Sequence, residues 1–129
     1  MSDDEYIIIR SEKAPEPVGA YIHARRVGDL IFLAGIGPRT KDSDFIPIGA
    51  EAETEAVIRN VKQVLEDAGS SLEKVVDVQC FLTNMKRDFK AFNEVYAKHF
   101  RDIPATRTTV EVTSLPTPIN VEFKVIATV

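Results

Sequence analysis

The sequence predicts an α+β fold in which two helices pack on one face of a mixed or mainly antiparallel β-sheet. Residues 51–68 and 88–100 carry apolar side chains at the spacing of amphipathic helices. β-favouring segments precede, separate and follow them, which gives the order β-β-β-α-β-α-β-β. A chain of 129 residues, 44% of them hydrophobic, also suits a single domain over residues 1–129 with its own core.

The first three predicted strands occupy residues 5–10, 21–26 and 30–34. Residues 11–18 contain two prolines and predict a loop after the first strand. A turn at Gly28 joins the next two strands, which predicts a β-hairpin.

A long connection and the clearest helix follow. Residues 35–49 show no hydrophobic period, and loops of this length in compact domains often carry function. Residues 51–68 predict a helix that Gly69 ends. Its apolar stripe consists of Val57, Ile58, Val61, Val64, Leu65 and Ala68. We expect this stripe to cover one face of the sheet.

A strand at residues 75–82 and a helix at residues 88–100 are predicted next, with Asp88 as the N-cap of the helix. The residues of this helix expected to face inward are Phe89, Phe92, Tyr96 and either His99 or Phe100. The pattern again predicts a helix packed on the sheet.

The single cysteine, Cys80, lies in the predicted strand and shares a face with Val76, Val78 and Leu82. A reactive thiol needs an electropositive, accessible setting, so we interpret Cys80 as buried and inert. One cysteine also excludes a disulfide within the chain.

The last two strands place charged side chains at regular positions. Alternation puts Arg107, Thr109 and Glu111 on one face and Thr108, Val110 and Val112 on the other. In the final strand, Ile119, Val121, Phe123, Val125 and Ala127 form an apolar face opposite Asn120, Glu122 and Lys124. We expect the faces with Arg107, Glu122 and Lys124 to be the side of the sheet that no helix covers. Burial of that side between subunits would create clefts that contain charge.

An arginine and a glutamate on neighbouring strands allow two interpretations. The arginine fork binds a carboxylate through two charge-assisted hydrogen bonds, and a nearby glutamate takes a proton from water if its pKa suits. Arg107 and Glu122 would then perform acid-base chemistry on an anionic substrate. Alternatively, Arg107 forms a structural ion pair with Glu111 or Glu122.

Several segments resemble the RidA/YjgF family of small imine and enamine deaminases, in an order and spacing that run along nearly the whole chain. The matching segments are Gly19-Ala20-Tyr21, Leu33-Ala34-Gly35-Ile36-Gly37-Pro38-Arg39, Asn60-Val61-Lys62, Phe81-Leu82-Thr83-Asn84-Met85-Lys86-Arg87-Asp88-Phe89, Asn93-Glu94-Val95-Tyr96, Arg107-Thr108-Thr109-Val110-Glu111-Val112 and Leu115-Pro116-Thr117-Pro118-Ile119. The 2-aminomuconate deaminase-like branch is the most similar.

This resemblance implies a chorismate-mutase-like α+β fold, a homotrimer, and active sites in clefts between subunits. It also implies that Arg107 holds the substrate carboxylate, that Glu122 positions the hydrolytic water, and that Tyr21 and Asn93 lie at the cleft. The chain departs from the general pattern at Thr109, where many members carry cysteine, and in the sequence Ile36-Gly37-Pro38-Arg39 after Gly35. These departures bear on the preferred substrate.

The loop after the hairpin offers further substrate-binding candidates. Gly35, Ile36 and Gly37 would let backbone N–H groups approach a bound anion, and Arg39 would clamp the second carboxylate of a dicarboxylate such as 2-aminomuconate. The alternative for Arg39 is a solvated surface side chain. Tyr21 either closes the cleft or lies in a subunit interface, Asn93 either supports the cleft or bonds on the helix surface, and His23 either moves protons or is structural.

The implied reaction is hydrolytic deamination of an enamine or imine, with release of ammonia. The substrate is either 2-aminomuconate or a short 2-imino acid. Three alternatives stay open: a non-catalytic ligand-binding or translation-modulating trimer, a chorismate-mutase-like isomerase, and a ribonuclease. The two histidines, single cysteine and lack of HExxH, phosphate-loop, GxGxxG or GxSxG motifs predict no metal and no cofactor.

Charge and hydropathy limit the partners. A net charge of −4 and a pI near 5.2 oppose binding to nucleic acid or to an anionic membrane surface. The chain shows neither a secretory signal pattern nor an apolar run of about 20 residues, the length needed to span a bilayer. We therefore expect a cytoplasmic protein.

Overall fold

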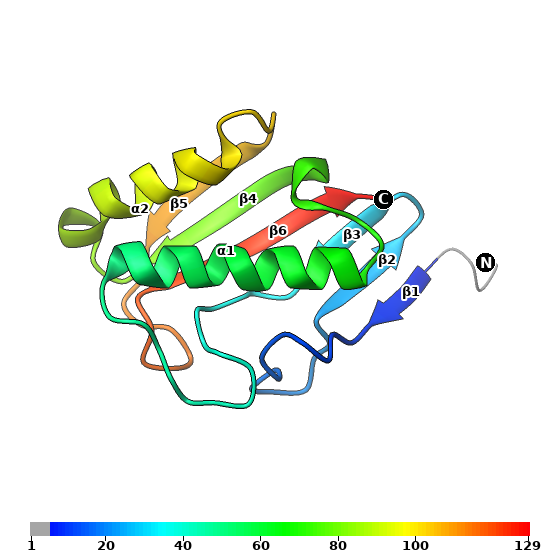
Figure 1. Cartoon of the computed structure of the whole chain (residues 1–129), viewed down its shortest axis with the longest axis horizontal. Helices are drawn as coiled ribbons and strands as arrows, with labels where there is room; N and C mark the ends of the chain where they lie inside the picture. Colours follow the sequence, from blue (N-terminus) through cyan, green and yellow to red (C-terminus); the bar gives the residue numbers. More distant parts are fainter. Residues whose placement is uncertain (1–5) are drawn as a thin grey trace.

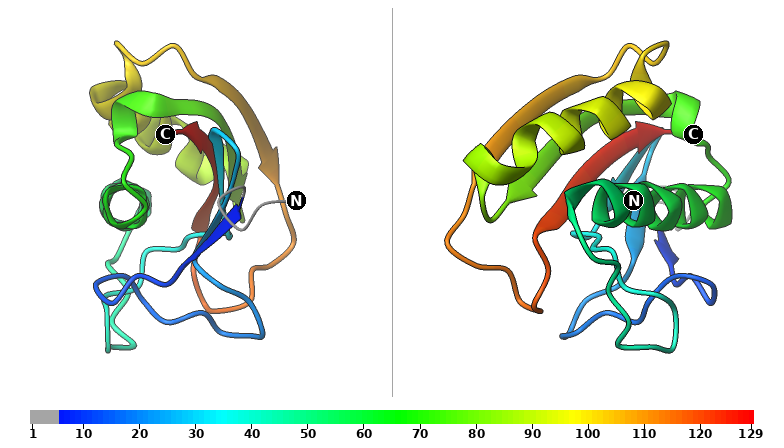
Figure 2. Two further views of the ribbon diagram at one scale, coloured as in Figure 1. Left: turned by 90° about the vertical axis from the view of Figure 1, so that its right-hand side faces the viewer. Right: turned by 60° about the vertical axis from the view of Figure 1, so that its left-hand side comes forward.

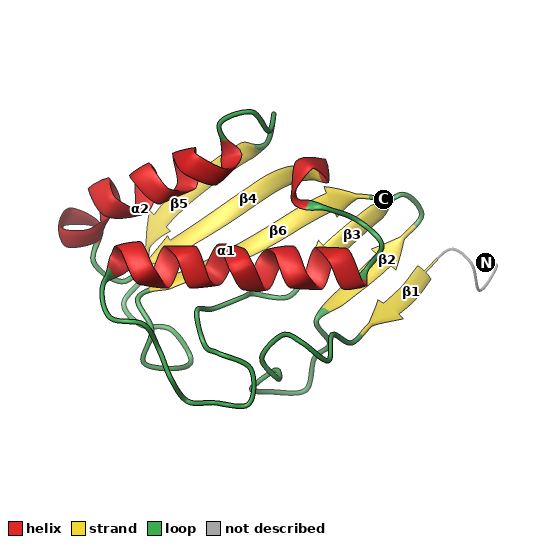
Figure 3. Ribbon diagram, viewed as in Figure 1, coloured by secondary structure: helices red, strands yellow, loops and turns green. Residues whose placement is uncertain are grey.

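The computed structural model describes residues 6–129 and consists of one six-stranded sheet with two helices on one face (Figures 1 and 3). The strands are β1 (Tyr6–Ile9), β2 (Ala24–Val27), β3 (Leu30–Leu33), β4 (Val75–Leu82), β5 (Thr106–Glu111) and β6 (Val121–Thr128). The helices are α1 (Ala50–Asp67), the short 3₁₀ helix η2 (Leu72–Lys74) and α2 (Met85–Phe100). The predicted class and element order are confirmed. Glu5, the first residue of the first predicted strand, lies outside the described residues.

The sheet is mixed, in the order β1-β2-β3-β6-β4-β5. Every neighbouring pair is antiparallel except β4 and β5. A parallel pair needs a crossover connection, and α2 supplies it. β6, the last strand of the chain, therefore lies between β3 and β4 at the centre of the sheet.

Both helices pack on the same face of the sheet, as the edge-on view shows (Figure 2). The alternating burial of β6 places Phe123 and Val125 beneath them, in a core that also contains Ile58 and Leu65 of α1 and Phe92 of α2. We call the other side the open face. Glu122 and Lys124 lie on it, together with the exposed apolar side chain of Phe32.

Two element boundaries differ from the predictions by three residues. Strand β2 begins at Ala24, not at residue 21, so Tyr21 lies in the loop before it. Helix α2 begins at Met85, and Asn84 is the N-cap, because its side chain accepts a hydrogen bond from the Arg87 N–H at 3.0 Å. The predicted N-cap Asp88 instead lies in the first turn, where it is buried.

The start of β4 contains a third difference. The register between β4 and β6 shifts between Val75 and Asp77, as in a β-bulge. Val75 is therefore buried and Val76 is exposed, so Val76 does not share the buried face of Cys80. The rest of the strand alternates as predicted, and Cys80 is fully buried.

No helix in the part of the chain that the structure describes has the length and apolar character needed to cross a bilayer.

Candidate active site

Arg107 lies in β5 on the face of the sheet that the helices cover. Its partner in the parallel ladder is Val78, a fully buried core residue. The alternation predicted from Arg107 is confirmed as far as Glu111, where β5 ends, but the expectation that Arg107 shares the uncovered side with Glu122 is wrong. Helix α2 crosses over the edge of the sheet and covers the face that carries Arg107. Arg107 and Glu122 thus lie on opposite faces.

Aromatic rings and an amide of α2 fix the guanidinium of Arg107. Its Cζ atom lies 5.9 Å from the ring centroid of Phe89, 5.1 Å from that of Phe92 and 4.7 Å from that of Tyr96. A cation over aromatic faces is stabilised by the ring quadrupoles. Arg107 Nη1 also donates a hydrogen bond to Asn93 Oδ1 at 2.8 Å. We call these four α2 side chains the Arg107 cradle.

The structural ion pair considered for Arg107 does not form. Across residues 6–129, neither Glu111 nor Glu122 pairs with it. Glu111 Oε1 instead accepts a hydrogen bond from the Met85 N–H at 2.8 Å, at the start of α2. Arg107 therefore keeps a fixed positive charge that no carboxylate of the described chain neutralises.

A polar group without a partner lies beside Arg107. The buried hydroxyl of Tyr96 has no hydrogen-bond partner within residues 6–129, and such a group costs stability. The Cys80 thiol is opposite Thr109 in the ladder, and burial raises its pKa to about 12. Cys80 is thus an inert thiol at neutral pH, as predicted.

Glu122 is held against Gly35. A Cβ atom on Gly35 would lie 2.8 Å from Glu122 Oε2, so only glycine fits there without displacement of the carboxylate. The next residues along each segment pair, since Ile36 and Phe123 exchange backbone hydrogen bonds of 2.8 and 3.0 Å. Burial raises the pKa of Glu122 above its ordinary value. A carboxyl group with a raised pKa is a better general base once it is ionised.

Five of the predicted substrate-binding residues line one small pocket: Tyr21, Gly35, Ile36, Gly37 and Arg39. Its volume of about 40 Å³ leaves room for only a few water molecules. The pocket of one subunit is therefore too small to enclose a substrate by itself.

Arg39 and Tyr21 are each held by backbone contacts at this pocket. Arg39 Nη2 donates to the carbonyl of Glu16 at 2.8 Å. The Tyr21 hydroxyl accepts a hydrogen bond from the Val18 N–H at 3.2 Å, and its side chain is 44% exposed. Buried Asn60 of α1 donates from Nδ2 to the carbonyls of Gly37 and Arg39 at 2.9 and 2.8 Å. Asn60 thus ties the loop to the helix.

His23 is structural. It is 4% exposed, and its Nδ1 accepts a hydrogen bond from the Ser11 N–H at 3.0 Å. Its Nε2 lies 2.8 Å from the carbonyl of Pro15, which only accepts hydrogen bonds. Both ring nitrogens of His23 thus have backbone partners, which supports a structural role.

The sequence-predicted residues thus form two groups. Arg107 and Thr109 lie beneath α2, which contributes Asn93 to the same group. The other predicted site residues lie around Gly35. The sequence analysis missed two contributions. The aromatic residues of the Arg107 cradle were interpreted only as core, because their helical spacing is that of a buried stripe, and nothing in the sequence singles out Asn60 as the residue that holds the loop.

No cluster of three or more metal-ligating side chains is present within residues 6–129.

Comparison with protein families identifies a match over residues 11–129 to the family model described as Endoribonuclease L-PSP. A RutC family protein from Saccharolobus solfataricus is 42% identical over 123 residues, which cover 93% of this chain and 95% of the relative. The chloroplastic Reactive Intermediate Deaminase A of Arabidopsis thaliana is 34% identical over 122 residues, 94% of this chain and 65% of that protein.

Solved structures show the same fold. The YjgF gene product from E. coli has a TM-score of 0.87 and 28% identity, and E. coli TdcF with bound serine has a TM-score of 0.88 and 29% identity. Each match covers 95% of this chain and 98% of the solved chain. The family model, the close relatives and the shared fold together show that this chain belongs to the RidA/YjgF family, described as Endoribonuclease L-PSP.

Proposed function

We propose that this protein is a cofactor-independent hydrolase that deaminates enamine or imine derivatives of amino acids and releases ammonia. The observation that carries the proposal is the fixed, unneutralised guanidinium of Arg107. An arginine held in this way suits a substrate carboxylate, which it binds through two parallel hydrogen bonds. The relative named Reactive Intermediate Deaminase A and the TdcF structure with bound serine support an amino-acid-like substrate.

The reaction needs one base and good positioning. The enamine tautomerises to the imine, and ionised Glu122 takes a proton from water as the water oxygen attacks the imine carbon. The imine nitrogen takes up a proton as the water adds, which gives the carbinolamine. Glu122 returns its proton to the amine, the carbinolamine hydroxyl loses its own proton as the C–N bond breaks, and an oxo acid and ammonia leave. Such substrates hydrolyse slowly in water, so a positioned base and a carboxylate anchor suffice. Backbone groups of residues 35–37 and the Tyr21 ring complete the cleft.

The active site is shared between subunits of a homotrimer in this proposal. Arg107 and Glu122 lie on opposite faces of one sheet, so one copy does not bring both to the same substrate. The open face also exposes apolar side chains, among them Ile8, Phe32 and Val110, which suits burial against another copy. One subunit then supplies the Arg107 group and its neighbour supplies the Gly35 group.

The substrate class depends on Arg39. Its guanidinium lines the pocket beside Gly35 and, among residues 6–129, bonds only a backbone carbonyl, so a second substrate carboxylate would replace a neutral partner with a charged one. This favours a dicarboxylate such as 2-aminomuconate over a short 2-imino acid. Substitution of Arg39 by alanine is then expected to weaken dicarboxylate turnover more than monocarboxylate turnover. Equal losses for both substrates would contradict the second clamp.

Ammonia release tests the proposal. Wild type, Arg107→Ala and a surface control, Arg101→Ala, are assayed on 2-aminomuconate and on 2-iminobutyrate generated in situ. Because Arg107→Ala removes two charge-assisted hydrogen bonds, kcat/KM should fall about 10²-fold or more. Arg101 lies at the exposed end of α2, so its replacement should leave the rate unchanged.

The other outcomes identify the alternatives. If the assembled wild type accelerates neither reaction but binds small carboxylates through Arg107, the protein is a non-catalytic ligand-binding trimer. Substrate conversion without ammonia release would indicate an isomerase. The family description makes RNA cleavage a control assay, and the net charge of −4 argues against it.

A further inference from the structure

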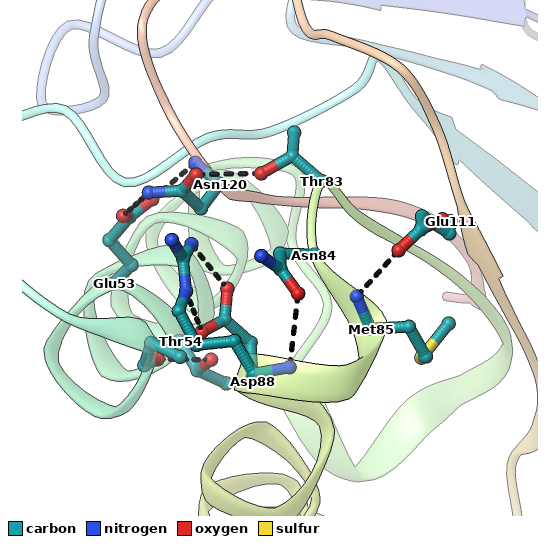
Figure 4. A network of polar contacts seen from close by, with 10 residues as sticks. Glu53, Thr54, Thr83, Asn84, Met85, Asp88, Glu111 and Asn120 are labelled. Atoms are coloured by element: carbon teal, nitrogen blue, oxygen red, sulfur yellow. Dashed lines mark hydrogen bonds and ion pairs between the residues drawn. The ribbon is translucent and has the colours of Figure 1, made fainter.

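Asn120 is bonded through all four of its polar groups in a network that joins α1, β4 and β6 (Figure 4). Glu53 Oε1 accepts from the Asn120 N–H, and Glu53 Oε2 accepts from Asn120 Nδ2, both at 2.8 Å. The Thr83 hydroxyl donates to Asn120 Oδ1 at 2.6 Å, and the Thr83 N–H donates to the Asn120 carbonyl at 3.1 Å. The backbone and the side chain of Asn120 are therefore both fixed.

Glu53 is an unusual residue for this place. It is 2% exposed, and it lies in the first turns of α1, among residues that pack on the core. A buried carboxylate needs hydrogen bonds or a positive charge to offset its desolvation. Its two hydrogen bonds go to a single residue, and the nearby cation, Arg87, is already in an ion pair with Asp88. Both carboxylate oxygens of Glu53 thus accept hydrogen bonds from Asn120.

The network lies immediately before the proposed base. Asn120 ends the loop of residues 112–120, and Glu122 follows two residues later in β6. The next residue, Phe123, pairs with Ile36, and the Glu122 carboxylate occupies the space where a Cβ atom on Gly35 would lie. A shift at Asn120 therefore moves the start of β6, and it changes where Glu122 lies relative to Gly35.

We propose that Glu53, Asn120 and Thr83 are positioning residues that fix the Glu122 carboxylate against Gly35. The proposal rests on the proposed role of Glu122 as the base. It extends that site to a side chain of α1 that touches neither substrate nor water. Since Arg107 lies in the other group, loss of this network should lower kcat and leave KM nearly unchanged.

Hydrogen-bond polarity provides a sharp test. Asn120→Asp places a carboxylate opposite the Glu53 carboxylate, so two acceptors face each other and repel. Adding Glu53→Gln restores a donor: the new amide N–H₂ at position 53 donates to the new carboxylate at position 120, and the amide oxygen still accepts from the backbone N–H. The double variant therefore rebuilds the network with donor and acceptor exchanged, and a double-mutant cycle measures the coupling.

The experiment compares wild type, Glu53→Gln, Asn120→Asp and the double variant Glu53→Gln/Asn120→Asp by steady-state kinetics. We expect kcat of Asn120→Asp to fall about 10-fold or more, because small misplacements of a reacting group are costly. The kcat of the double variant should return to within about 3-fold of the wild-type value, because the rebuilt network places Glu122 correctly again. KM should stay within about 2-fold throughout, since the carboxylate anchor is unchanged. An unchanged kcat in Asn120→Asp, or a double variant that regains thermal stability but not kcat, would overturn the proposal.

Two further measurements keep the result clear. If Asn120→Asp does not fold, Thr83→Val removes only the hydroxyl bond to Asn120 and should still lower kcat; an unchanged kcat would count against the network.

NMR titration of the Glu122 carboxyl needs no turnover. A Glu122 titration that shifts in Asn120→Asp and returns in the double variant supports the positioning role. This holds even if the wild type releases no ammonia, because that result would refute only the deaminase function. An unshifted titration overturns the positioning role.

Discussion

At the scale of single residues, Glu122 is both the proposed base and a destabilising group at neutral pH. Burial raises its pKa, so the folded protein favours the protonated form. Its contribution to stability is therefore fully present below the unfolded pKa of Glu and is lost as pH rises through the raised folded value. Catalysis requires the ionised form, so function and stability demand opposite protonation states at this position.

Replacement of Glu122 by glutamine should separate these effects. Without a carboxylate to take the proton from water, kcat should fall about 10²-fold or more. The free energy of unfolding should be equal to or above that of wild type at about pH 8, and this advantage should shrink as pH falls toward about 4. Parallel kinetics and urea unfolding at both pH values check the prediction. A variant less stable than wild type at the higher pH would show that the buried carboxylate is stabilising.

Gly35→Ala tests the same contact from the other side. The new Cβ atom would lie 2.8 Å from Glu122 Oε2, so the carboxylate must move. The backbone of Gly35 is not in the left-handed region, so alanine adds no backbone strain. We expect kcat to fall about 10-fold or more with a small change in Tm, because the displacement is local. A kcat equal to that of wild type would contradict the assigned place of Glu122.

At the scale of the elements, α1 supports the loop that carries Arg39. Asn60 is buried and donates to two loop carbonyls, and its substitution by aspartate replaces both donor bonds with repulsion between acceptors. Asn60→Asp should lower the free energy of unfolding by about 1–3 kcal/mol. It should also raise KM for a dicarboxylate more than for a monocarboxylate.

Lys62→Ala, an exposed change on the same helix, serves as the matched control for Asn60→Asp. Urea unfolding and KM for both substrates are measured for the two variants. Equal KM changes for the two substrates would show that the loop held by Asn60 does not contribute to the recognition of dicarboxylates.

The sequence predicted the elements well, and the exceptions have physical causes. The start of α2 was assigned to Asp88 because aspartate is a favoured N-cap, yet Asn84 is equally favoured, and periodicity does not choose between them. Alternation correctly placed Arg107 and Thr109 on one face of β5. It did not reveal which face α2 covers, since an edge strand with polar residues on one side and Val110 on the other fits either orientation. The Val75–Asp77 bulge likewise leaves no clear sequence signal.

At the scale of the whole molecule, the separation of Arg107 from Glu122 makes the assembly part of the proposed chemistry. A cleft between subunits would unite the two groups, and each site would take one residue from each neighbour. In a ring of three subunits, every site is then equivalent. The sequence predicts candidate site residues, but their distribution over two faces could not be predicted, because it depends on the path of α2 over the sheet.

Mixed assemblies should reveal this sharing. Arg107→Ala and Glu122→Gln subunits are each expected to be inactive alone. A trimer that contains both kinds of subunit has one intact site, so the mixed trimers should recover about a third of wild-type activity. Co-expression with two different tags and assay of the doubly purified fraction provide the measurement. If that fraction is inactive, the two residues do not serve one site across an interface.

The Arg107 cradle has an optical consequence. The chain contains three tyrosines and no tryptophan, so its ultraviolet emission comes from tyrosine. Tyr96 stacks on Phe100 at a centroid distance of 4.3 Å, and the Arg107 guanidinium is another of its neighbours. An anion that binds Arg107 changes the electric field at this phenol ring. Tyrosine emission therefore offers a label-free signal for ligand screening, and Tyr96→Phe supplies its blank.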